Sequence, residues 1–173
     1  MTWFAKAIGA ARSRQLTEAR ASLDKLAPLR DALIAKNEAY WAGQVEIQRK
    51  AAEGIILIAE QKIAEGLELL KAAADAEDAT EKSPVTPGPL VPARELYAET
   101  LLGQRRFTEA LAEYERTMTR EPGRFRGIAG AMMAAQVSGN TAKAKKYATD
   151  LLALAKTAAP GRPQIAEAQK LAR

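Results

Sequence analysis

The stretch GQRRFTEALAEY, residues 103–114, has a counterpart further along the chain in VSGNTAKAKKYA, residues 137–148. Each stretch is a short polar turn followed by residues with the spacing of an amphipathic helix, and 34 positions separate Ala110 from Ala144. A helix–turn–helix unit that recurs at this period indicates an array of helical repeats. The sequence therefore predicts an all-α fold.

The composition agrees with closely packed helices. Hydrophobic residues make up 47% of the 173 residues but aromatic residues only 5%, and small alanine side chains let two helix backbones approach. No segment alternates apolar and polar residues as a half-buried strand does. The chain has no cysteine and no histidine, so disulfides are excluded and the commonest metal ligand and general base are missing. We expect no enzyme, no cofactor and no metal site.

Neither a membrane span nor a leader is expected from the sequence. No apolar run reaches the roughly 18 residues that a transmembrane helix needs, and the N-terminal MTWFAKAIGAARSR lacks the pattern of a signal peptide. The compartment stays open: the cytoplasm if Met1 is the natural start, the periplasm if the chain is part of a longer exported protein.

The repeat pattern predicts four helix pairs within a single domain, residues 1–173. The pairs cover residues 2–36, 38–79, 92–122 and 124–157, and a capping helix covers residues 163–172. A proline-rich insertion, KSPVTPGPLV at residues 82–91, separates the second pair from the third. Within these pairs we expect Pro28 to bend or interrupt its helix and the Thr141 hydroxyl to cap the helix that it begins.

Seven residues lie where tetratricopeptide repeats favour their types: Trp3, Gly54, Ala110, Tyr114, Pro122, Gly139 and Ala144. The chain thus resembles the tetratricopeptide repeat family over residues 2–156, and most closely over residues 92–152. It also resembles the C-terminal part of longer bacterial tetratricopeptide proteins of unassigned function, which carry a segment similar to EDATEKSPVTPGPLVPAREL. The resemblance implies a right-handed α-solenoid that binds other proteins and catalyses no reaction.

In such a solenoid the first helix of each pair faces a concave groove, and that face is the predicted peptide-binding site. Its residues are Ile55, Ile58, Glu95, Glu99, Leu102, Arg126 and Met133. Two glutamates would repel a ligand carboxylate, so these residues do not form the carboxylate clamp of the family members that bind chaperone C-termini. The mixture of apolar and charged residues favours an amphipathic helix or an extended peptide.

The proline-rich insertion allows two interpretations. A loop folded over the groove would offer Val85 and Leu90 to a ligand. A rigid spacer would only fill the gap between the second and third pairs. Just before it, Asp75, Glu77, Asp78 and Glu81 form an acidic cluster whose spacing fits no EF-hand, and we expect a solvated helix end there.

Two other functions remain as alternatives. The first is a structural or self-association module of a larger protein, with Trp3, Phe4, Tyr40 and Trp41 packing the first two pairs or driving homo-oligomerisation. The second is nucleic-acid binding through the basic termini: residues 140–173 carry 7 basic and 2 acidic groups. No aromatic residues interleave with those lysines and no nucleic-acid motif is present, which stands against it.

Overall fold

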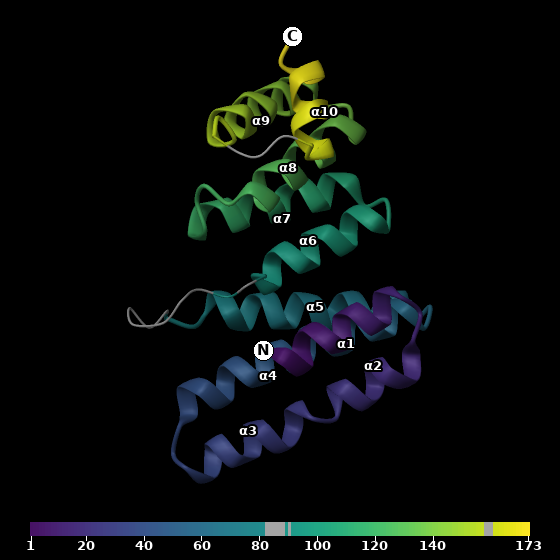
Figure 1. Ribbon diagram of the computed structural model, residues 1–173, viewed down its shortest axis with the longest axis vertical. Helices are drawn as coiled ribbons and strands as arrows, with labels where there is room; N and C mark the ends of the chain where they lie inside the picture. The colour runs from purple at the N-terminus through teal and green to yellow at the C-terminus, as the bar shows by residue number, and fades with distance from the viewer. Residues whose placement is uncertain (82–88, 90, 158–160) are drawn as a thin grey trace. The chain divides into compact units, whose positions relative to one another are not determined.

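The fold of the chain is all-α in the computed structural model, which describes residues 1–81, 89, 91–157 and 161–173 (Figure 1). Within these ranges the regular structure is helical and contains no strand, so the predicted fold class is confirmed at this level. The chain divides into two compact units, Met1–Leu96 and Tyr97–Arg173, called unit 1 and unit 2 below. The prediction of a single domain stays a prediction.

Unit 1 is built around a long central helix, α4, to which the other helices attach. Helix α4 packs most extensively against α5, and also against α3 and α1, while α1 packs against α2. The unit ends with the first turn of α6. The helices of this unit are α1 (Thr2–Arg12), α2 (Leu16–Leu23), α3 (Leu26–Ala35), α4 (Ala39–Ala59), α5 (Ile63–Asp78) and the start of α6 (Ala93–Gly103). Residues 2–36, predicted as one helix pair, contain three helices, α1 to α3.

Unit 2 contains a series of helices, α7 to α10, in which each packs on the next. Helix α7 packs on α8, α8 on α9, and α9 on α10. A helix is present at the predicted residues as α10, and it packs against α9; its role as a cap stays a prediction. The helices of this unit are the remainder of α6, α7 (Phe107–Arg120), α8 (Phe125–Val137), α9 (Thr141–Leu154) and α10 (Pro163–Leu171).

The same turn follows five of the described helices, α1, α3, α4, α6 and α8. A residue with positive φ comes after each of them: Arg14, Asn37, Gln61, Arg105 and Gly139. The amide of this residue donates to the carbonyl three positions earlier, and the next amide donates to the carbonyl five positions earlier, as in Arg105 N to Leu102 O at 3.1 Å and Arg106 N to Leu101 O at 2.9 Å. These two bonds define the Schellman motif, which satisfies the free carbonyls at a helix end. The chain is thus repeat-like in its local structure as well as in its sequence.

At Pro28 the structure shows an interruption and no bend: α2 ends at Leu23 and α3 begins at Leu26, so Pro28 lies in the first turn of α3, where its missing amide hydrogen is not needed. The predicted interruption is confirmed, and one other helix end differs from the prediction. Helix α9 is capped by Asn140 rather than by Thr141, because the Asn140 Oδ1 accepts from the Lys143 amide at 3.1 Å. Both residue types are good caps, and Asn140 comes one position earlier.

Helix α3 is attached to α4 by an ion-pair network centred on Glu46. The Arg49 guanidinium donates two hydrogen bonds of 2.9 Å to the Glu46 carboxylate, and Arg30 of α3 donates one of 2.8 Å. These partners, Arg49 most of all, lower the pKa of Glu46 to about 2 although burial opposes them. The network ties the outermost helix of unit 1 to its central helix.

The lowered pKa of Glu46 makes the stability of unit 1 sensitive to acid. A carboxylate whose folded-state pKa is depressed stabilises the fold above its unfolded-state pKa, here about 4.5, and loses that contribution as the pH falls towards 2. We expect Glu46→Gln to cost about 1 kcal/mol at pH 7, the scale of a partly exposed network. Urea unfolding at several pH values should show this difference shrinking between pH 4.5 and pH 2. A difference that stays constant with pH would contradict the role of the Glu46 charge.

Candidate functional site

The predicted groove residues of unit 1 are largely part of its core. Ile55 is buried on α4, and Ile58 packs where α4 crosses α5, since a Cβ added to Gly66 would lie 2.9 Å from the Ile58 side chain. Glu95, in the first turn of α6, is also buried. Ile55 and Glu95 thus offer little surface to a ligand in this structure.

None of the helices in the described part of the chain combines the length and apolar composition that crossing a bilayer requires.

The groove residues predicted in unit 2 are more accessible. The Arg126 Nη2 of α8 donates to the Glu99 Oε2 of α6 at 2.9 Å, and both side chains are partly exposed. Leu102 lies one turn beyond Glu99 and is half-buried, while Met133 is 42% exposed on α8. The structure therefore brings two of the predicted groove residues, Glu99 and Arg126, together as an ion pair.

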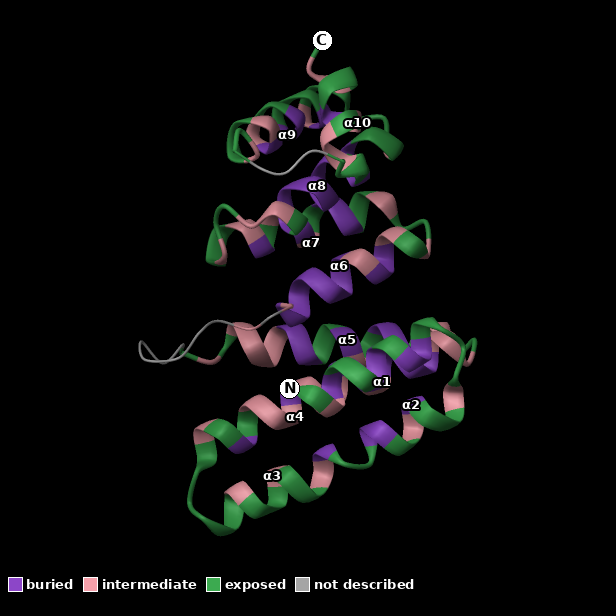
Figure 2. Ribbon diagram, in the orientation of Figure 1, coloured by how far each residue is buried: buried purple, intermediate pink, exposed green. Residues whose placement is uncertain are grey.

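Helix α8 is largely buried, as Figure 2 shows, but Arg126, Met133, Gln136 and Val137 are exposed. Arg126, Met133 and Val137 differ by 7 and 4 positions, so at about 100° per residue they lie within one narrow strip of the helix. Val137 is 50% exposed, and the sequence analysis missed it although the step of four from Met133 points to it. Arg126, Met133, Val137 and Glu99 are called the α8 strip below.

The two loop residues predicted to contact a ligand, Val85 and Leu90, lie outside the described residues. In the acidic cluster that precedes them in the sequence, Glu81 is exposed, but the other three residues have partners, contrary to the prediction of a solvated helix end. The Arg94 guanidinium donates to Asp75 Oδ1 and to Asp78 Oδ2, each at 2.6 Å. Glu77 Oε2 accepts from the Ala93 amide at 2.7 Å and so caps α6. Among the described residues no group of acidic side chains is arranged to hold a metal ion.

Unit 2 also has a recess that the sequence analysis did not anticipate. A pocket of about 420 Å³ opens where the end of α7, the following turn, and helices α8 and α9 meet. Its lining residues are Glu115, Met118, Thr119, Pro122, Gly123, Ile128, Lys146, Tyr147 and Asp150. They come from four separate segments, which is why no single motif indicated the pocket.

A short hydrogen-bond network fixes one wall of this pocket. The Tyr147 hydroxyl and the Lys143 Nζ both donate to Glu115 Oε1, each at 2.6 Å. Burial, and then the bond to Glu115, raises the pKa of Tyr147 far above its ordinary value. Burial alone would raise the pKa of Glu115, but the bonds from Lys143 and Tyr147 outweigh it and leave that pKa lowered. The pair therefore stays as a neutral phenol bonded to a carboxylate at neutral pH.

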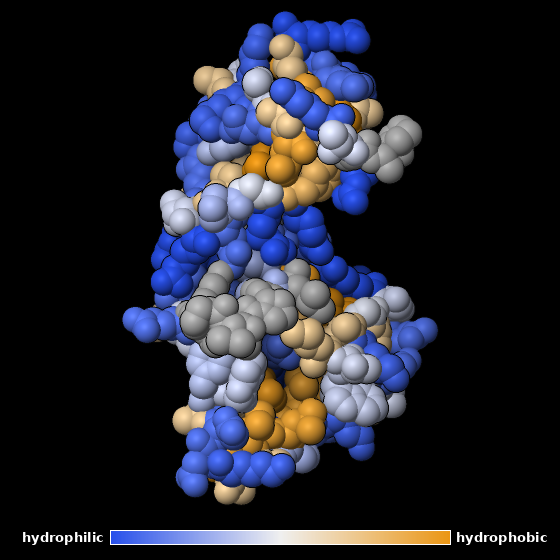
Figure 3. Space-filling view, turned by 60° about the vertical axis from the view of Figure 1, so that its left-hand side comes forward, coloured by the Kyte–Doolittle hydropathy of each residue, from blue (hydrophilic) through white to orange (hydrophobic). Residues whose placement is uncertain are grey.

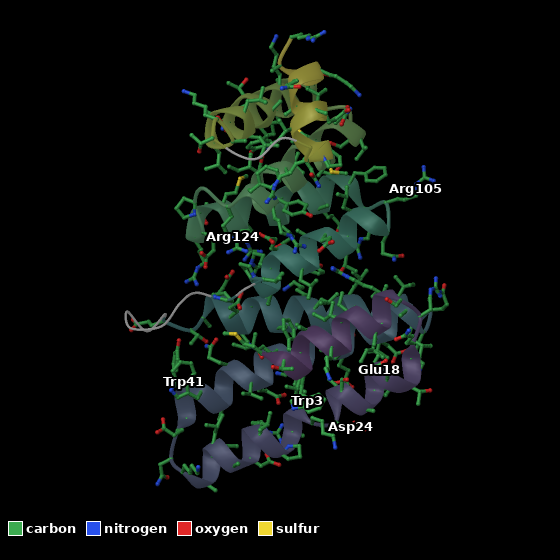
Figure 4. All side chains as sticks on the ribbon, in the orientation of Figure 1. Trp3, Glu18, Asp24, Trp41, Arg105 and Arg124 are labelled. Carbon is green, nitrogen blue, oxygen red and sulfur yellow. The ribbon has the colours of Figure 1, made fainter. Side chains whose placement is uncertain are left out.

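Unit 1 has exposed apolar side chains of its own, and Figure 3 shows a hydrophobic area on its surface. Leu29 and Ile34 of α3 are exposed, as is Trp41, which points away from α4 (Figure 4). The Trp41 ring meets the Tyr40 ring edge-on, with 5.0 Å between centroids. Of the four aromatic residues predicted to pack the first two pairs, Phe4 is buried and Trp41 is not.

Comparison with known proteins adds no assignment to this geometry. No family model, no curated protein and no solved structure matches the chain. The functional argument therefore depends on the residues and contacts described above.

Proposed function

We propose that the chain is a non-catalytic, tetratricopeptide-like binding scaffold, and that the α8 strip of unit 2 binds a peptide segment of a partner protein. The recurrent helix–turn–helix connections support the repeat class, in which such units form a right-handed solenoid. The absence of histidine and cysteine from the sequence supports binding rather than catalysis. The identity of the partner is left to experiment.

The exposure of Met133 and Val137 is the observation that carries this proposal. Helix α8 buries eight of its residues, yet these two large apolar side chains are 42% and 50% exposed on one strip. The Glu99–Arg126 ion pair belongs to the same strip, so an apolar area adjoins a polar element that could orient a ligand. Recognition of this kind suits an amphipathic helix or an extended peptide.

A substitution in the strip tests the proposal directly. Peptides selected from a random displayed library on the full chain should bind Met133→Asp about tenfold more weakly than the wild type, because a carboxylate would replace the apolar contact. Fluorescence anisotropy of the labelled peptides measures these affinities. Leu154→Asp is the matched control, since Leu154 is 45% exposed on α9 of the same unit and lies off the strip.

The two variants separate specific binding from general surface effects. We expect Leu154→Asp to bind the selected peptides within about twofold of the wild type, because surface substitutions away from a site have small effects. Equal weakening by both variants, or no enrichment of any peptide, would contradict the proposal. The self-association alternative stays a prediction and would involve Leu29, Ile34 and Trp41 of unit 1.

A further inference from the structure

We propose that the pocket between α7, α8 and α9 of unit 2 binds the side chain of an arginine residue from a partner polypeptide. The pocket shares no residue with the α8 strip, so this inference goes beyond the proposed function and does not depend on it. Three features carry it: apolar walls, a cation that the chain itself holds against an aromatic ring, and an accessible carboxylate beside that cation.

The walls of the pocket suit the aliphatic part of a long side chain. Met118, Pro122, Ile128 and the ring of Tyr147 supply apolar surface, and the volume is about 420 Å³. Long cationic side chains bury their methylene groups on such surfaces and keep the charged end near water. The pocket is thus large enough and apolar enough to accept an arginine stem.

Lys146 places a cation at the mouth of the pocket. Its Nζ lies 4.9 Å from the centroid of the Tyr147 ring and 2.7 Å from Asp150 Oδ2. A cation held over an aromatic face beside a carboxylate is a favourable arrangement, and here the chain fills it with its own lysine. The Lys146 side chain is 64% exposed, and exposed ion pairs between residues four apart on a helix are weak. An incoming cation could therefore displace it at small cost.

Asp150 is the carboxylate that would receive the ligand. The Glu115 Oε1 already accepts hydrogen bonds from Tyr147 and Lys143, whereas Asp150 is paired with the displaceable Lys146. Arginine fits this position better than lysine, because a planar guanidinium can stack on the Tyr147 ring while it donates two parallel bonds to one carboxylate. The geometry thus favours a guanidinium over an ammonium ion.

The test uses the full chain and three acetylated, amidated pentapeptides with two alanines on each side of a central residue. That residue is arginine, citrulline or norleucine, which vary the charge while keeping a long side chain. Chemical-shift changes of the α7–α9 amides in nitrogen-15 NMR spectra report binding. We expect the arginine peptide to bind about tenfold more tightly than the other two. Equal binding of the norleucine peptide would overturn the proposal and leave only an apolar recess.

Two variants with opposite expected effects on affinity test the proposal further. Lys146→Ala should tighten binding of the arginine peptide about threefold, because it removes the internal competitor, and Asp150→Asn should weaken it about tenfold. Lys145→Ala is the matched control, since Lys145 is also exposed on α9 but does not line the pocket. All four proteins should give the same far-ultraviolet circular dichroism. Weaker binding by Lys146→Ala, or equal tightening by Lys145→Ala, would show that the pocket does not select the cation.

Discussion

Replacing Gly130 by alanine should destabilise unit 2 by about 2–3 kcal/mol, the upper range for overpacking a core. Gly130 lies on α8 opposite the ring of Tyr114 on α7. A Cβ at this position would come within 2.2 Å of Tyr114 Cζ and 2.3 Å of its Cε1. No carbon atoms pack so closely, and the Tyr114 ring is itself buried. The substitution must therefore separate α7 and α8, which pack directly against each other.

Gly103→Ala is the matched control for this prediction. Gly103 is also a helical glycine of unit 2, but a Cβ added there meets no atom within 4 Å. Alanine is the better helix former, so this variant should gain up to about 0.5–1 kcal/mol. The same substitution thus has opposite expected signs at the two sites. A loss of similar size at both would mean that backbone conformation, rather than the Tyr114 contact, makes glycine necessary at Gly130.

A second change identifies the clash. Tyr114→Leu should itself destabilise the unit. In the Tyr114→Leu background, however, Gly130→Ala should cost at least about 1 kcal/mol less, because the aromatic ring with which the new Cβ would clash is absent. Urea unfolding followed by circular dichroism gives the free energies, and hydrogen exchange of α7 and α8 peptides assigns them to unit 2. Additive effects of the two substitutions would contradict the contact.

The helices and their connections were predictable because their signals are local. Helices α6 and α7 fill residues 92–122, and α8 and α9 fill residues 124–157, the ranges predicted for two helix pairs, to within about three residues at each end. Helix α4 begins immediately after Glu38, where another predicted pair starts. Proline, glycine and polar residues interrupt the 3.6-residue periodicity at each of these ends. The Asn140 cap was missed only because two good capping residues are adjacent.

The surface of the candidate site was much less predictable. Periodicity gives the direction of a side chain around its helix but not the depth of its surroundings. Ile55 and Met133 were both assigned to a groove face, yet Ile55 is buried and Met133 is exposed. The pocket at Tyr147 combines α7, α8, α9 and a turn, so it exists only after these segments have packed together. Such features need the tertiary structure, because no spacing along the chain encodes them.

The role of the acidic residues near the end of α5 was unpredictable for a similar reason. Arg94 follows Asp75 by 19 positions and Asp78 by 16, with the proline-rich segment between them. No helical or turn spacing relates residues so far apart. In the structure Arg94 forms ion pairs with Asp75 and Asp78. These ion pairs attach the first turn of α6 to α5 within unit 1, where the sequence suggested a solvated helix end.

Replacing Arg94 by methionine should destabilise unit 1 by about 2–4 kcal/mol, since breaking a buried ion pair by removing one partner is costly. The Arg94 side chain is 2% exposed, and its Nε and Nη2 each lie 2.6 Å from a carboxylate oxygen. Methionine keeps most of the apolar stem and leaves Asp75 and Asp78 without this cation. Asp75 and Asp78 are partly exposed, so water can solvate them when the arginine is removed. The expected loss of stability is therefore smaller than for a fully enclosed ion pair.

Lys71→Met is the matched control for Arg94→Met, because Lys71 is the other cation bonded to Asp75 and its side chain is exposed. We expect this variant to lose less than about 1 kcal/mol, as exposed pairs usually do. The two tryptophans of the chain, Trp3 and Trp41, both lie in unit 1, so tryptophan fluorescence during urea unfolding follows this unit. Similar losses of unfolding free energy in the two variants would show that the burial of Arg94 does not increase the contribution of its ion pairs to stability.

The pH dependence of Arg94→Met provides an independent check on the same contact. Hydrogen bonds from Lys71 and then from Arg94 hold the pKa of Asp75 below its ordinary value of 3.8. The stabilisation is therefore complete above that value and is lost as the pH falls below it. The difference between wild type and Arg94→Met should accordingly be largest at neutral pH and shrink in acid. A difference that stays constant as the pH falls would contradict the role of the ion pair in the stability of unit 1.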